Sequence, residues 1–273
     1  MSTTNSINTN TAAAAALEQL NSTRIQLAQT QQAVTTGLRV SGPQDDASSF
    51  AIALNLKGTI AGDTAVQTAL STGESAVNVA VNAGQSIADL LTQAKAKIVE
   101  ANQSGLDATS RTALHNDFAA LRSQINTIVA TASFNGTNLI DSGATTLNVL
   151  STADGSVIAV SAQGLTSSAL GISSADLTTS GSATAALTAI NTAITTVANA
   201  LAALGSAVSR IEDQSTFTGK LIDTLNAGVG DLVDADLAQE SAQLQALQIK
   251  QQLGVQALSI ANQTPQSLLS LFR

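Results

Sequence analysis

The chain has 273 residues, enough for one or two domains, and a formal net charge of -8 at pH 7. It has no cysteine and one histidine, His115, which excludes disulfides, Cys-ligated metals and paired-histidine sites within one chain. The acidic charge argues against nucleic acid as a partner, because that affinity comes mostly from Lys and Arg. With no Trp or Tyr and five Phe, the core must use aliphatic residues and alanine, which suits long helices packed side by side. We therefore expect no enzyme active site, cofactor or metal.

No stretch reaches 18 consecutive apolar residues, so the sequence predicts no membrane span. The N-terminus, MSTTNSINTN, is polar and lacks the basic start of a secretory signal, so no cleavable signal peptide is expected.

Apolar residues recur with heptad spacing along most of the chain. The pattern covers residues 13–34 with two breaks, then 66–101, 114–128 and 187–232, and less regularly 244–261. A sustained alternation of three and four residues predicts helices that supercoil around partner helices. Gly73 and Gly84 occupy seam positions of the second stretch, where they permit close backbone approach.

The heptad pattern stops between residues 131 and 182, where Gly, Ser and Thr dominate. Within this region, residues 146–150 alternate, Asp154 and Gly155 supply a turn, and residues 157–160 follow, which predicts a β-hairpin with a loop of about four residues. We expect a mainly α fold, a long antiparallel helical coiled-coil bundle with a small β-hairpin and paired N- and C-terminal segments.

No charged residue lies between Asp176 and Arg210, although a helix is predicted there. Its outer face carries Thr, Asn, Ser and Ala, so the helix needs neighbours on more than one side.

Three features could suggest chemistry. The acidic motifs at 42–46 and 228–236 could hold a metal, but they lack a third ligand or the order of a calcium loop, so we interpret both as helix starts. His115 lies beside the seam residue Leu114 and is expected to be a solvated helix histidine.

Short motifs at both ends of the chain form an ordered set, at residues 5–10, 37–41, 45–47, 134–139, 234–240, 256–263, 265–266 and 268–271. Together they resemble the N- and C-terminal regions of bacterial flagellins and cover nearly the whole chain. One departure is Ser209 before Arg210, where that family usually has Asn.

The resemblance implies two domains. Residues 1–43 and 229–273 would form the inner terminal coiled coil, and residues 44–228 would form a rod-like helical domain with the β-hairpin region at about 131–182. The outer domains that longer flagellins insert would be absent, since only about 20 residues separate Ile172 from the returning helix.

The implied function is a structural subunit that polymerises into the flagellar filament for motility, alone or mixed with other flagellins. Its partners would be the type III export apparatus, an export chaperone, the filament cap and the hook-junction proteins. It would be secreted without cleavage and become extracellular, with no membrane insertion. A hook–filament junction protein, or from another class a secreted coiled-coil adhesin or effector, would share the helical pattern. The expected polymerisation residues are Leu17, Leu20, Leu27, Leu244, Leu247, Leu258, Leu268, Leu269, Leu271 and Phe272.

Overall fold

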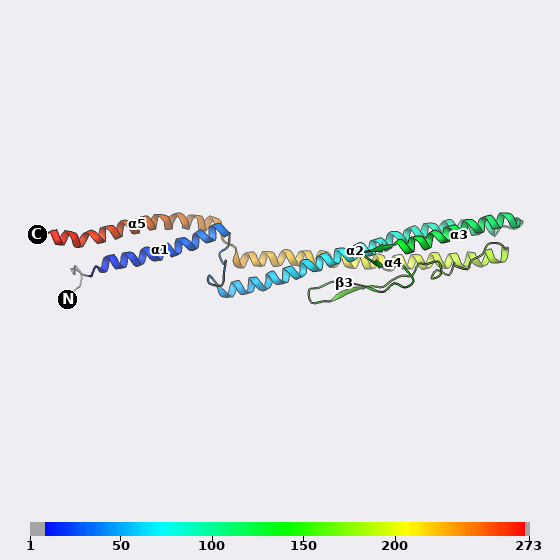
Figure 1. The fold of residues 1–273 in the computed structure, drawn as a ribbon, viewed down its shortest axis with the longest axis horizontal. Helices are drawn as coiled ribbons and strands as arrows, with labels where there is room; N and C mark the ends of the chain where they lie inside the picture. Colours follow the sequence, from blue (N-terminus) through cyan, green and yellow to red (C-terminus); the bar gives the residue numbers. More distant parts are fainter. Residues whose placement is uncertain (1–8, 271–273) are drawn as a thin grey trace. The chain divides into compact units, whose positions relative to one another are not determined.

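Helices make up most of the computed structural model, which describes residues 9–270 and their side chains as far as Gln263 (Figure 1). Within that range the order is α1 (Thr11–Thr36), α2 (Ala47–Ala101), α3 (Ala108–Thr131), four short strands, α4 (Ser180–Val233) and α5 (Leu237–Ser270). The predicted mainly α fold with a small β element is confirmed.

The helices are longer than the heptad stretches that predict them. The largest difference is in α2, which begins at Ala47 rather than near residue 66. Gly58, Gly62 and Asp63 interrupt the apolar pattern there without ending the helix, because a helix tolerates isolated glycines at about 1 kcal/mol each.

The chain divides into two compact units, which are described separately. The terminal unit comprises residues 1–58 and 224–273, and the central unit comprises residues 59–223. Helices α2 and α4 each contribute residues to both units. The predicted limit at residue 229 lies in α4, as does the division at residues 223 and 224, whereas the predicted limit at residue 43 lies in the loop before α2 and the division at residues 58 and 59 lies inside α2.

The core of the central unit is built from the predicted heptad seams of α2, α3 and α4. Its fully buried side chains include Leu70, Ile87, Leu91 and Ile98 of α2, Phe118 and Ile125 of α3, and Ile190, Val197 and Ile211 of α4. Close approach at the two seam glycines is confirmed. A Cβ atom on Gly73 would lie 2.5 Å from Val149 Cγ2, and one on Gly84 would lie 2.8 Å from Leu201 Cδ2.

The predicted hairpin is present as β3 (Leu147–Leu150) and β4 (Val157–Val160), which pair antiparallel. Ser151 N–H donates to the Ser156 carbonyl at 2.8 Å, which leaves a loop of four residues. A second hairpin, β1 (Ser133–Phe134) and β2 (Thr137–Asn138), was not predicted. Its turn is Asn135-Gly136, with φ of 48° and 79°, a pair that favours tight two-residue hairpins.

The segment that connects β4 to α4, residues 161–179, follows α3 without regular structure. Three α3 side chains bind its backbone. Asn126 Oδ1 accepts from Ser167 N–H at 2.9 Å, Arg122 donates to the Ser173 carbonyl at 2.6 Å, and His115 Nδ1 accepts from Leu177 N–H at 3.3 Å. The prediction of a solvated His115 is therefore wrong, because its Nδ1 binds the connecting segment and its side chain is only 27% exposed.

Within the described residues one helix, α4, is long and apolar enough to cross a membrane by length and composition, with an 18-residue window of mean hydropathy 1.4. The criterion of 18 consecutive apolar residues missed it because Thr and Asn are interspersed. Of that window 28% is buried inside the chain, and α4 contributes a buried stripe to the central unit that includes Ala183, Ile190 and Val197.

Asp63 occupies a seam position of α2, three residues before Val66, and is only 6% exposed. Its Oδ2 atom is buried and has no hydrogen-bond partner. A buried, unsatisfied polar group costs about 1–3 kcal/mol.

We therefore expect Asp63→Leu to raise the free energy of unfolding of the central unit by about 1–3 kcal/mol in urea titrations followed by circular dichroism. Asp89→Leu, at an exposed carboxylate of the same helix, should change it by less than about 0.5 kcal/mol. If both substitutions changed the free energy of unfolding equally, the buried, unsatisfied Asp63 carboxylate would not be what lowers stability.

Candidate functional site

Helices α1 and α5 pair along their length in the terminal unit (Figure 1). The pair is antiparallel. Asn10 Nδ2 donates to the Ala261 carbonyl at 2.7 Å near one end, and Leu38 forms a β-bridge with Asp234 at the other. Between these points, a Cβ atom on Gly254 would lie 3.1 Å from Leu20 Cδ1.

Local sequence fixes where these two helices begin and where α1 ends. Asn10 caps α1 by accepting from Ala13 N–H at 3.0 Å, and Gly37 ends it with φ of 72° and an N–H donated to the Ala33 carbonyl. Asp236 begins α5, since its Oδ1 accepts from Ala238 and Gln239 N–H groups. The helix-start interpretation of the 228–236 motif holds for Asp236, whereas residues 228–233 form the last turns of α4.

The residues predicted for polymerisation fall into three groups: those that are buried or half-buried in the chain, one that is exposed, and those that lie outside the described residues. Leu20 and Leu247 are buried within the terminal unit, and Leu27, Leu244 and Leu258 are half-buried. Leu17 is 48% exposed. The side chains of Leu268 and Leu269, and all of Leu271 and Phe272, lie outside the described residues. The heptad seam is therefore largely used inside one chain.

A second set of apolar side chains remains exposed on α5. Ile249, Leu253 and Ile260 are 58%, 63% and 61% exposed, and their spacing of four and seven residues places them on one face, which we call the outer stripe. Sequence reasoning missed them. A second heptad register that contains Ala242, Ala246, Ile249, Leu253 and Ile260 carries the signal.

The outer surface of the pair carries few charges. Between residues 241 and 270 the only charged residue is Lys250, and α1 contains only Glu18 and Arg24. On α1, Ile25 is 62% exposed, and Leu17, two turns earlier, is 48% exposed. Because little charge would have to be desolvated, this surface is suited to burial against another protein.

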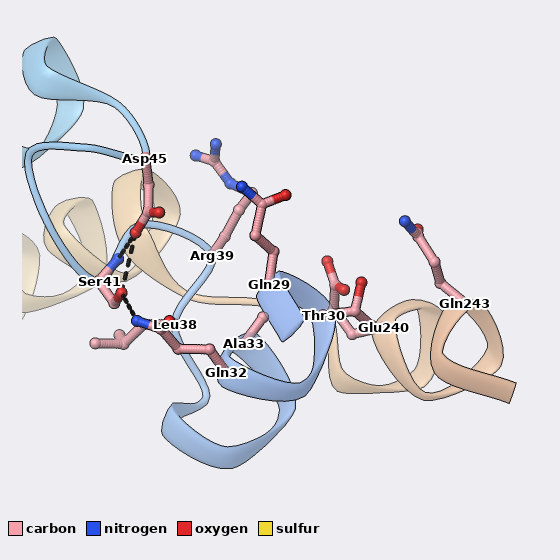
Figure 2. A pocket seen from close by; sticks show the side chains of 10 residues that line it. All are labelled: Gln29, Thr30, Gln32, Ala33, Leu38, Arg39, Ser41, Asp45, Glu240 and Gln243. Atoms are coloured by element: carbon pink, nitrogen blue, oxygen red, sulfur yellow. Dashed lines mark hydrogen bonds between the residues drawn. The ribbon is translucent and has the colours of Figure 1, made fainter. Parts of the chain in front are cut away.

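A polar pocket of about 270 Å³ lies where the end of α1, the 38–45 loop and the start of α5 meet (Figure 2). Arg39 donates to the Leu232 carbonyl at 2.7 Å, and Gln32 donates to Ser41 Oγ at 2.6 Å. Backbone bonds from Arg39 and Val40 to the Val233 carbonyl join the loop to the end of α4. The side chains of the pocket thus connect segments of the terminal unit that are distant in sequence.

Both carboxylates of the 42–46 motif organise the start of α2. Asp45 accepts from the Ser41 N–H and hydroxyl and from Gly42 N–H, and Asp46 accepts from Ser48 and Ser49. The Ser41 N–H is the main cause that lowers the pKa of Asp45, and the Ser49 hydroxyl is the main cause that lowers the pKa of Asp46. The helix-start interpretation is confirmed. No group of three His, Asp or Glu side chains in the described part of the chain is placed to hold a metal.

The geometry of paired terminal helices agrees with the comparisons to known proteins. The model of the bacterial flagellin N-terminal helical region matches residues 7–145, and that of the bacterial flagellin C-terminal helical region matches residues 187–272.

Two curated relatives match over nearly their whole length. Flagellin FljM of Caulobacter vibrioides is 46% identical over 270 residues, covering 98% of this chain and 99% of its own. A flagellin of Brucella melitensis is 40% identical over 284 residues with the same coverage. A solved structure described as a flagellar hook-associated protein of Vibrio parahaemolyticus covers 70% of the chain with a TM-score of 0.58 at 12% identity, which indicates a shared fold alone.

Proposed function

The chain belongs to the bacterial flagellin family and is a structural subunit of the flagellar filament, and we propose that its outer stripe and the exposed side chains of α1 form the polymerisation surface. The filament is extracellular, so the subunit acts outside the cell. The observation that supports the proposal is the outer stripe itself, whose three aliphatic side chains are each more than half exposed.

In this mechanism the predicted polymerisation residues act at two levels. Leu20 and Leu247, with the half-buried seam residues, hold α1 against α5 within one chain. Leu17, Ile25 and the outer stripe then bury against neighbouring subunits. We propose that these contacts are head-to-tail, so that they extend into an open helical lattice rather than closing a symmetric pair.

We assign residues 1–43 and 229–273 to an inner coiled coil of the filament and residues 44–228 to its rod. In support, α4 starts at Ser180 soon after the connecting segment, which leaves no room for an inserted outer domain. The export apparatus, an export chaperone, the filament cap and the hook-junction proteins remain proposed partners. We further propose that the chain has no enzymatic activity and is not inserted into a membrane.

Electron microscopy of the purified chain after seeding tests the proposed assembly. We expect long filaments of uniform width. A hook–filament junction protein would instead label a single band on the flagellum with a specific antibody, and a secreted adhesin or effector would stay monomeric. The comparisons do not favour either alternative, because the relatives that match over the full chain are flagellins.

Export is expected to leave the N-terminus intact. The first ten residues are polar and carry no positive side chain, so they lack the features by which a cleaved secretory signal is recognised. N-terminal sequencing of subunits from filaments should find a start within the first few residues of this sequence. Removal of about 15 residues or more, the length of a short signal peptide, would show that a different export route is used.

A further inference from the structure

His115 Nδ1 faces two groups that require opposite protonation states. It accepts from Leu177 N–H at 3.3 Å, and it lies 3.2 Å from Asp176 Oδ1. Accepting from an N–H requires a lone pair on Nδ1, as in the neutral ring protonated at Nε2, whereas donating to a carboxylate requires a proton on Nδ1. One nitrogen cannot make both hydrogen bonds at once.

We propose that His115 is a pH-sensitive attachment point for the connecting segment, residues 161–179. The neutral ring accepts from Leu177 N–H. The protonated ring releases Leu177 and donates to Asp176 instead. Protonation therefore moves one hydrogen bond between adjacent residues, just before α4 begins at Ser180.

Asp176 is already in position to accept the proton-bearing nitrogen. Its Oδ2 accepts from the Thr178 hydroxyl at 2.6 Å and its Oδ1 accepts from Thr178 N–H at 3.1 Å. The Thr178 hydroxyl is the main cause that lowers the pKa of Asp176, with a smaller contribution from His115. The carboxylate thus stays charged in the pH range in which an imidazole titrates.

The other charged groups around His115 are engaged elsewhere. Arg111, one turn earlier on α3, donates to the Ala101 and Gln103 carbonyls at the end of α2. Asp117 of α3 pairs with Lys97 of α2 at 3.2 Å. The first half of α4 carries no charged residue. Asp176 is therefore the charged group that the described structure places against the His115 ring.

The effect of protonation should be local. The Leu177 side chain is fully buried, so its N–H cannot readily replace a lost acceptor with water. The other two attachments use the Asn126 amide, which does not titrate, and the Arg122 guanidinium, which stays charged at all relevant pH values. Residues 176 and 177 should respond to pH, while Ser167 and Ser173 should not.

Nuclear magnetic resonance of the full-length monomer tests this inference, since its single histidine gives one imidazole titration. From about pH 8 to about pH 5, the Leu177 amide shift should follow the His115 midpoint. The exchange protection of that amide, corrected for intrinsic pH dependence, should fall roughly tenfold or more. The Ser167 amide should change in neither respect.

His115→Gln provides the matched control and should abolish the Leu177 transition. The proposal would be overturned if the Leu177 amide shift did not change with pH while the His115 ring signals did. It would also be overturned if the Leu177 amide shift changed with pH in His115→Gln as it does in the parent chain. If that variant lost helicity by circular dichroism, the response of the Leu177 and Ser167 amides in the parent chain would still decide the matter. Filament growth is not a readout here, so this test and the test of assembly can fail independently.

Discussion

A chain carrying Ile249→Ser, Leu253→Ser and Ile260→Ser is expected to remain monomeric at concentrations at which the parent chain grows filaments. The three side chains are about 60% exposed in the subunit, so assembly can bury their remaining surface. Full burial of such a side chain stabilises by about 1.5–3 kcal/mol, so the stripe could contribute roughly 3–6 kcal/mol per subunit. The critical concentration should therefore rise roughly a hundredfold to ten-thousandfold.

Light scattering after seeding measures this effect, and circular dichroism checks the monomer. Helix content should be nearly unchanged, because the stripe faces away from the α1–α5 seam and Ser and Ile have similar helix propensities. Gln245→Ser, Gln248→Ser and Gln252→Ser together form the matched control, since these exposed residues lie on the same helix and are already polar. An unchanged critical concentration in the stripe variant, with the control behaving like the parent, would exclude the stripe from the polymerisation surface.

A second comparison separates the two levels of the mechanism. Leu20→Ser with Leu247→Ser removes buried side chains of the terminal unit, so it should lower the helix content of the monomer as well as assembly. We expect the stripe variant to lose assembly but keep its helices, and the seam variant to lose both. That result would assign the outer stripe to contacts between subunits and the seam to packing within one chain.

The sequence predicts the helices well because the apolar heptad is a local and repeated signal. It could not give the start of α2, since Gly58, Gly62 and Asp63 weaken the pattern where the helix nevertheless continues. The hairpin at Asn135-Gly136 could have been predicted, because an Asn-Gly pair is typical of two-residue hairpin turns. The three hydrogen bonds that attach the connecting segment to α3 could not be predicted from the sequence. Each joins two residues that are separated by at least 41 positions in the chain.

The polymerisation residues show a different limit of sequence reasoning. A single heptad on α5 has one apolar seam, and Leu244, Leu247 and Leu258 identify it correctly as a packing face. A seam alone does not say whether its partner is in the same chain or in a neighbour. Burial in the folded chain makes that distinction, and it moves the proposed contacts from Leu247 to Ile249, Leu253 and Ile260.

Removal of residues 249–273 is expected to abolish filament growth and to leave a soluble, partly helical monomer. The deletion takes away the whole outer stripe, the half-buried Leu258 and the apolar residues 268, 269, 271 and 272. At about 1.5–3 kcal/mol for each fully buried side chain, this group could supply on the order of 10 kcal/mol per subunit to assembly.

The same deletion tests whether the terminal helices depend on each other. It removes the Ala261 carbonyl that accepts from Asn10 and the Gly254 surface that packs on Leu20, so the first half of α1 should lose its order. The core of the central unit, residues 59–223, contains none of the deleted residues and should retain its helices and its melting transition. Circular dichroism should therefore show residual helix, while seeded light scattering shows no polymer. Normal filaments from the truncated chain would mean that the α1–α5 pair is not the assembly element, because its outer stripe and the internal contacts made by Gly254 and Ala261 would be missing.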